Sequence, residues 1–181
     1  PMDAPLHEGG FVVLAMNLPG TSSGARQPQT FGIREARDVK AGVDMLRRRA
    51  YVAPDKIALI GVGSGANACI IAAKQDGTLK TLVLAEPAKH FDDAFAERMG
   101  PDQLWLPPLR SLCRWTFQVM YGVDTGELDV NNYASTIADR HVLMNDGRQG
   151  LMQPTNLRAV QHFLQKHLAD QPVVASAEAG K

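Results

Sequence analysis

The chain has 181 residues, of which 45% are hydrophobic, and its 19 basic and 19 acidic residues give a formal net charge of zero at pH 7. This length predicts one domain with a sizeable core, and the charge balance excludes the electrostatic attraction that draws proteins to nucleic acids or anionic membranes. No run approaches the roughly 18 apolar residues of a membrane span, and the first residues lack the apolar core of a signal peptide. The two cysteines have no metal-ligand spacing, so we expect buried thiols, a reducing cytoplasmic compartment, and no metal or other cofactor.

The first predicted element is a strand at Phe11–Met16, a continuous apolar run typical of a parallel strand that is buried on both faces. Turn residues at Leu18–Gly24 follow it and predict a loop. Over Gly32–Arg49 the apolar side chains recur at helical spacing, with charged side chains on the other side. That pattern predicts an amphipathic helix.

A second strand is expected to begin at Lys56 and to run to Ile60. It leads into the glycine-rich segment Gly61-Val62-Gly63-Ser64-Gly65-Ala66, and the small residues of Ala66–Lys74 predict a helix packed closely on a sheet. Another apolar strand is expected at Leu79–Ala85. The alternation of strands and helices predicts right-handed crossovers and a parallel sheet.

Residues 88–138 differ from the rest of the chain, because they hold both tryptophans and a cluster of prolines. Helical spacing there predicts short helices at residues 92–98, 109–121 and 130–137, separated by glycine and proline. Such an insert forms either a lid over a pocket or an irregular helical layer over the sheet, and the sequence leaves both interpretations open.

The C-terminal part predicts a last short strand at His141–Met144 and an amphipathic helix at Asn156–Leu168, whose two histidines are expected at its surface. The small and polar residues 170–181 predict a flexible tail. Together, the elements predict a single α/β domain over residues 1–169. We expect a three-layer α/β/α fold with a short, mainly parallel sheet, helices on both faces, and the helical insert before the last strand.

The glycine-rich segment fits two functional templates. As G-x-G-x-x-A, Gly61, Gly63 and Ala66 predict a dinucleotide site, with pyrophosphate at the helix N-terminus and Glu86 on a ribose hydroxyl. As the G-x-S-x-G nucleophile elbow, Gly61 and Gly65 take the outer positions, and Gly63 stands where the nucleophile belongs. A third interpretation is a glycine turn that only packs a helix on a strand.

In series, these segments resemble the α/β-hydrolase family, in its dienelactone-hydrolase-like and acyl-peptidase-like branch. Gly10–Ala15 followed by Leu18–Gly24 looks like the family's strand and D-x-x-G-x-G-x-S loop. Val52–Gly61 is similar to the family's approach to the nucleophile elbow, and the insert lies where the family keeps its cap. The resemblance covers about Gly10–Leu168 and implies an α/β-hydrolase-like fold.

The resemblance also implies that the catalytic triad is degenerate. Gly63 occupies the nucleophile position, Gly150 occupies the usual acid position, and Leu151–Thr155, where the family keeps its histidine, contains none. A serine hydrolase needs all three groups. We therefore expect a pseudoenzyme, a module that binds a small apolar ligand or a partner at the elbow.

A serine esterase that acts on a small ester remains an alternative. In that interpretation Ser64, one residue late in the turn, is the nucleophile. Glu86 or Asp146 then serves as the acid, and His90 or His141 as the base.

The resemblance implies one more expectation, about the sheet. In the family, the strand that supplies half of the oxyanion hole would precede Pro1, so we expect an N-terminally shortened hydrolase descendant. A sheet that lacks this strand exposes unpaired backbone groups, which favours a homo-oligomer or a complementing chain at the open edge.

Overall fold

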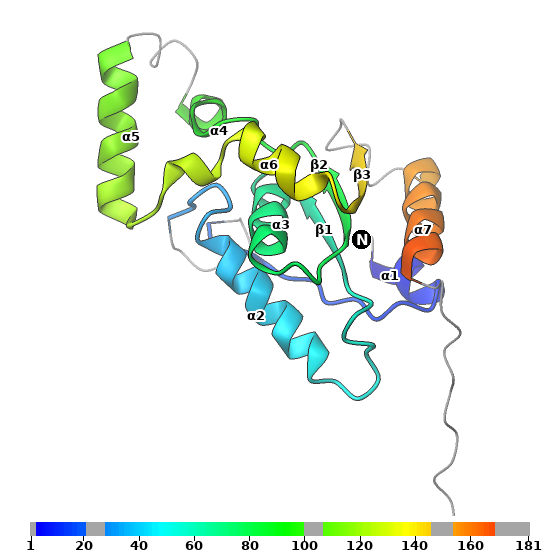
Figure 1. Ribbon diagram of the computed structural model, residues 1–181. Coiled ribbons are helices and arrows are strands. Elements are labelled where there is room, and N and C mark those ends of the chain that lie inside the picture. Colours follow the sequence, from blue (N-terminus) through cyan, green and yellow to red (C-terminus); the bar gives the residue numbers. More distant parts are fainter. Residues whose placement is uncertain (1–2, 21–27, 100–106, 146–153, 169–181) are drawn as a thin grey trace, which may run out of the picture.

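The computed structural model describes residues 3–20, 28–99, 107–145 and 154–168 (Figure 1). At its centre lies a parallel sheet of three strands in the order β1-β2-β3, with β1 at Ala58–Val62, β2 at Thr81–Ala85 and β3 at His141–Asn145. The middle strand, β2, is buried at all five positions, because it has a neighbour on each side and helices on both faces. This confirms the expected α/β class with a short parallel sheet.

One face of the sheet is covered by α3 (Ser64–Gln75), which packs on β1 and β2, and α2 (Glu35–Arg47) packs on α3 in turn. Residues 66–73 of α3 are all buried. Most of them are small, so the helix can lie close to the strands. The predicted helices at both places are confirmed, although α3 begins at Ser64, two residues before the expected start.

The other face carries α1 (Asp3–Glu8) and α7 (Pro154–Leu168), on the opposite side of the strands from α2 and α3 in Figure 1. Leu6 from α1 and Leu164 from α7 form a buried cluster with Val83 of β2. Helices therefore lie on both faces, as expected. The sequence did not predict α1, because six residues are too few for a clear helical pattern.

All three helices that were predicted in the insert are present. They are α4 (Phe91–Met99), α5 (Pro107–Tyr121) and α6 (Val130–Ile137), with the 3-10 turn η2 (Thr125–Glu127) between the last two. Because α6 packs on α3, this part of the insert is a helical layer.

An aromatic cluster joins the insert to the loop before α2. The ring centroids of Phe91 and Phe117 are 5.0 Å apart, and those of Phe31 and Phe117 are 5.7 Å apart. Phe117 lies towards the C-terminal end of α5, so this end of the helix is packed against the core. The rest of α5 extends along the border of the molecule farthest from α7 (Figure 1).

The strand predicted at residues 11–16 is wrong. Residues 11–18 have no strand conformation, and Val12, Val13 and Met16 are 50%, 38% and 40% exposed. Phe11 packs into the cluster beneath α7, whereas the Leu14 side chain lies against Gly42 of α2, on the other side of the sheet. Within the described residues its backbone makes no hydrogen bond with β1, and a segment without a hydrogen-bonded neighbour is not a strand.

The histidines of α7 differ from each other. His162 is exposed, as expected. His167 is half-buried, and its ring stacks on that of His141 with the centroids 4.1 Å apart. The surface prediction is therefore wrong for His167, because the first residue of β3 lies directly against α7.

The two cysteines are both free, in agreement with the expected thiols. Cys69 in α3 is buried, and burial raises its pKa to about 12. Cys113 in α5 is only half-buried, so the expectation of a buried thiol holds fully for Cys69 alone.

Arg140 lies just before β3 and joins two helix ends. Its largely buried guanidinium donates hydrogen bonds to the carbonyl oxygens of Ala73 at 2.7 Å, Leu79 at 3.0 Å and Thr136. Ala73 and Thr136 lie in the last turns of α3 and α6, whose carbonyl groups have no partner within their own helix. One side chain thus caps both helices.

Asp76 closes the turn after α3. Its carboxylate accepts hydrogen bonds from the Thr78 hydroxyl at 2.6 Å and the Thr78 backbone N–H at 3.0 Å, and it pairs with Arg47 at 2.7 Å. The bond from the Thr78 hydroxyl and the pairing with Arg47 lower the pKa of Asp76 to about 2, against the opposing effect of partial burial.

No helix among the described residues combines the length and the apolar character that crossing a bilayer requires. The predicted tail lies outside the described residues.

Candidate functional site

The glycine turn, residues 61–65, connects β1 to α3 through a single residue. Gly63 lies between Val62, the last strand residue, and Ser64, the first helical one, and has φ 55° and ψ −121°. A residue with a side chain rarely adopts this backbone conformation, and where it does the strain is found at functional sites. The connection is the sharp strand-to-helix turn that the nucleophile-elbow template requires, with a glycine at its apex.

The outer glycines of the turn differ in what they do. A Cβ atom on Gly61 would lie 2.5 Å from the carbonyl oxygen of Gly65 and 2.7 Å from the amide nitrogen of Ala66. Only glycine fits at position 61, because the strand and the start of α3 touch there. A Cβ atom on Gly65 would meet Leu18 at 3.9 Å, which is an ordinary contact. The packing interpretation of the turn therefore accounts for Gly61 and not for Gly65.

Ser64 has a partner that the sequence did not indicate. Its hydroxyl oxygen accepts a hydrogen bond from Gln29 Nε2 at 2.6 Å. None of the histidines, all of which lie in the described residues, hydrogen-bonds to Ser64. An amide side chain cannot take the proton of a serine, so this contact positions Ser64 without activating it.

Asn67 ties the start of α3 to two loops. It is almost fully buried, its Nδ2 donates to the carbonyl oxygen of Phe31 at 2.9 Å, and its Oδ1 accepts from the backbone N–H of Ala88 at 3.0 Å. The loop before α2 and the loop after β2 are thereby fixed beside the glycine turn. The one sequence signal was an asparagine among the small apolar residues of a buried helix.

Glu35 holds the loop before α2 in shape. Glu35 is 2% exposed, and its carboxyl group accepts hydrogen bonds from the Thr30 backbone N–H at 2.7 Å, the Thr30 hydroxyl at 2.6 Å and the Gly32 N–H at 3.0 Å. A Cβ atom on Gly32 would lie 2.6 Å from the carbonyl oxygen of Ser64. The loop that Glu35 organises therefore presses directly on the first turn of α3.

The structure places one of the predicted bases, His141, at the opposite end of the strands from Ser64. His141 pairs with Thr81 at the amino end of the strands, about 13 Å of strand away from the carboxyl end where the glycine turn lies. His141 is therefore misplaced as a base for Ser64. His90 is exposed and forms an isolated backbone bridge with Asp129.

Glu86 remains beside the turn. It follows Ala85, whose carbonyl oxygen accepts a hydrogen bond from the Gly63 N–H at 2.9 Å, and its own φ is 49°. Asp146, the alternative acid, lies outside the described residues. So do Gly150, at the position where the hydrolase family keeps its acid, and most of Leu151–Thr155, where the family keeps its histidine.

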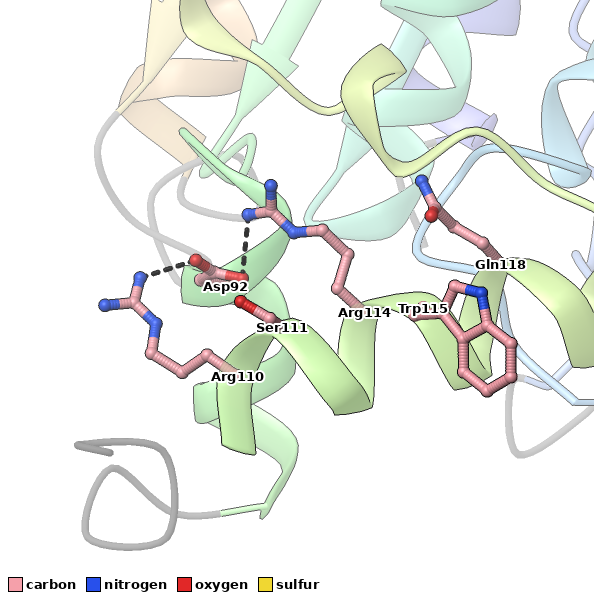
Figure 2. A pocket seen from close by; sticks show the side chains of 6 residues that line it. All are labelled: Asp92, Arg110, Ser111, Arg114, Trp115 and Gln118. Atoms are coloured by element: carbon pink, nitrogen blue, oxygen red, sulfur yellow. Dashed lines mark hydrogen bonds and ion pairs between the residues drawn. The ribbon is translucent and has the colours of Figure 1, made fainter. Parts of the chain in front are cut away.

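A second candidate site is a groove between α4 and α5 (Figure 2). It has a volume of about 320 Å³ and is lined by Asp92, Arg110, Ser111, Arg114, Trp115 and Gln118. Asp92 Oδ2 is 2.5 Å from Arg110 Nη2, and Asp92 Oδ1 is 3.0 Å from Arg114 Nη2. Partial burial acts to raise the pKa of Asp92, but the hydrogen bonds from both arginines outweigh it and lower the pKa.

The groove was not predicted from the sequence. A signal was present, because Arg110 and Arg114 are four residues apart on a helix without acidic residues, which places both guanidinium groups on one face. That spacing could not predict that their acidic partner, Asp92, lies on a different helix, α4.

The described residues contain no group of three or more His, Cys, Asp or Glu side chains that could hold a metal ion. No family model matches the sequence, and a search of the curated proteins finds no match.

Proposed function

We propose that this chain is an α/β-hydrolase-like binding module that does not catalyse ester hydrolysis. The observation that carries the proposal is Gly63, which occupies the apex of a strand-to-helix turn where a serine hydrolase would present its nucleophile. A glycine has no hydroxyl or thiol group to attack a carbonyl carbon. The neighbouring hydroxyl group, on Ser64, is held by Gln29.

Hydrolysis of short-chain p-nitrophenyl esters tests the catalytic part of the proposal. We expect no turnover above the buffer rate from the wild-type protein or from Ser64→Ala. Ser135→Ala, on α6, is the matched control for the loss of a serine hydroxyl. Turnover in the wild type that disappears in Ser64→Ala and persists in Ser135→Ala would establish the esterase alternative in its place.

The binding surface that we propose is the open edge of β1. Successive strand residues direct their backbone groups to alternate sides, and Gly63 N–H points towards β2, where it bonds to Ala85. The N–H and C=O groups of Ala58, Ile60 and Val62 therefore point away from β2. Within the described residues no backbone hydrogen bond reaches them from outside the sheet. Such an edge is a template for the addition of another strand.

The 11–16 run lies along this open edge. Phe11 packs against the same cluster as Ala58 and Ile60 near the start of β1, and Leu18 lies beside Gly65 past its end. Between these points Val12, Val13 and Met16 expose apolar side chains. The chain thus carries both an open strand edge and, at residues 12–16, a run that has the sequence of a strand but belongs to no sheet, and two copies can pair the two reciprocally. A second copy of this chain is the partner that we propose at this edge.

The oligomeric state in solution, measured by light scattering after gel filtration, tests this partner. We expect a dimer for the wild type and a monomer for Val62→Pro, which removes an outward N–H without removing a bond to β2. Val13→Lys places a charge in the exposed run and should also give a monomer. Val119→Lys alters an exposed valine of α5 and is the matched control that should remain a dimer. A monomeric wild type, or a Val62→Pro protein that dimerises as the wild type does, would refute the edge as a self-association surface.

A further inference from the structure

We propose that the groove between α4 and α5 binds an aromatic carboxylate. This inference is independent of the non-catalytic role and of the sheet edge, because the groove shares no residue with the glycine turn or with β1.

The charges of the groove are unequal. Two guanidinium groups, from Arg110 and Arg114, meet the single carboxylate of Asp92, and the other lining residues are uncharged. The lowered pKa of Asp92 keeps its carboxyl group ionised at neutral pH. One positive charge is therefore left over, and a ligand with one negative charge balances it.

The arginines retain donors for such a ligand. Each arginine pairs with Asp92 through its Nη2 atom, whereas a guanidinium group has five N–H donors in a fork that fits a carboxylate. Both side chains remain 46% exposed. Asp92 lies between the two guanidinium groups in Figure 2, and thus holds them in place beside the groove.

Trp115 supplies the apolar part of the site. Its indole ring lines the same groove and is 61% exposed, which leaves a flat apolar surface in water. Gln118, one turn further along α5, is held by the hydrogen bond from its Nε2 to the Thr125 hydroxyl at 2.9 Å. Trp115 directly follows Arg114 on α5 and lines the same groove, so a ligand in the groove can meet both an aromatic side chain and a guanidinium group. The volume of about 320 Å³ is at the small end of the range for ligand sites and suits one or two rings.

Structure alone does not require both arginines. A single ion pair from Asp92 would tie α4 to α5, and surface ion pairs add little stability. The second arginine and the exposed indole are explained together by a ligand that needs a positive charge beside an aromatic surface.

Isothermal titration calorimetry of the full chain with 1-naphthoate tests the proposal. Three comparison ligands each lack one feature: 1-naphthalenemethanol lacks the charge, cyclohexanecarboxylate lacks the aromatic ring, and inorganic phosphate lacks any apolar part. We expect saturable binding of 1-naphthoate that weakens as salt is added, and at least about tenfold weaker binding of each comparison ligand.

Two variants and one control complete the experiment. Arg114→Gln removes the surplus charge, and Trp115→Leu removes the ring while leaving both ion pairs intact. Each should weaken 1-naphthoate binding about tenfold or more, whereas Val119→Ala, on the same helix and outside the groove, should bind as the wild type does. Far-UV circular dichroism checks that α5 stays folded in each variant.

The proposal is overturned by any of three results. The first is the absence of saturable 1-naphthoate binding up to about 10 mM. The second is equal binding of the neutral alcohol, and the third is unchanged binding by Trp115→Leu. None of these results bears on esterase activity or on the oligomeric state, so a failure here is distinct from a failure of the proposed function.

Discussion

Replacing Glu35 by glutamine tests whether the loop before α2 is held by its buried carboxyl group. The substitution keeps the size and shape of the side chain, and it exchanges one oxygen for an NH2 group that can only donate. In the native protein both oxygens of Glu35 accept: Oε1 takes the Thr30 N–H, and Oε2 takes the Thr30 hydroxyl and the Gly32 N–H.

The magnitude follows from these bonds. The better orientation of the glutamine leaves its oxygen at the position that takes two donors, and its NH2 group then faces the Thr30 N–H. A buried N–H without an acceptor costs about 1–3 kcal/mol, and the glutamine NH2 group that faces it lacks an acceptor at the same place. We expect Glu35→Gln to lower the free energy of unfolding by about 3 kcal/mol, a large part of the stability of a small domain.

Urea unfolding followed by circular dichroism measures this loss. With a slope of about 2 kcal/mol per M, the midpoint should fall by about 1.5 M while the slope itself stays unchanged. Glu8→Gln, at an exposed position of α1, is the matched control and should change stability by less than about 0.5 kcal/mol. If Glu35→Gln unfolds within about 0.5 kcal/mol of the wild type, the loop is not held in this way.

Further substitutions test other contacts. Gly61→Ala should destabilise the fold by about 3 kcal/mol or more, because the new Cβ atom would meet backbone atoms of Gly65 and Ala66. Gly77→Ala is the control and should have little effect, because its Cβ atom would have nothing within 4 Å. Similar urea midpoints for the two variants would contradict this reasoning. Arg140→Met should lower the free energy of unfolding by about 3 kcal/mol, because it leaves buried carbonyl groups at the helix ends without donors. A loss below about 1 kcal/mol in urea unfolding would show that water replaces the guanidinium group. The folded-state pKa of Asp76, about 2, lies below the reference value of 3.8, so its contribution to stability is present above about pH 4 and is lost as the pH falls towards 2. The stability gap between wild type and Asp76→Asn should therefore shrink over that interval in thermal unfolding, and a constant gap would contradict the hydrogen bonding at Thr78.

Local patterns predicted most of the elements. The helix α6 matches its expected bounds at 130–137, and β2 lies within the strand that was expected at 79–85, because the pattern of apolar side chains follows directly from which sides are buried. The same reasoning failed for residues 11–16. An apolar run indicates that a segment can be a strand, but the strand also needs a neighbour to accept its hydrogen bonds, and no local pattern records that neighbour.

The candidate site was predicted in part for a similar reason. The spacing of Gly61, Gly63 and Gly65 is local, so the sharp turn and its glycine apex could be expected from the sequence. The contacts of Ser64 with Gln29 and of Asn67 with Phe31 join residues that are 35 and 36 positions apart. Such contacts depend on how α3 meets the loop before α2, which only the folded chain determines.

The burial of Cys69 has a practical consequence for following the motions of this protein. A thiol reacts with alkylating reagents as the thiolate, and burial both raises the pKa of Cys69 and blocks access to it, whereas Cys113 on α5 is partly accessible. The alkylation rate of Cys113 therefore measures the reactivity of an accessible thiol in the folded protein. The alkylation rate of Cys69 measures how often α3 separates from the sheet and exposes the buried thiol. The two natural thiols let one mass-spectrometric time course separate surface reactivity from the opening of the core, without any introduced label.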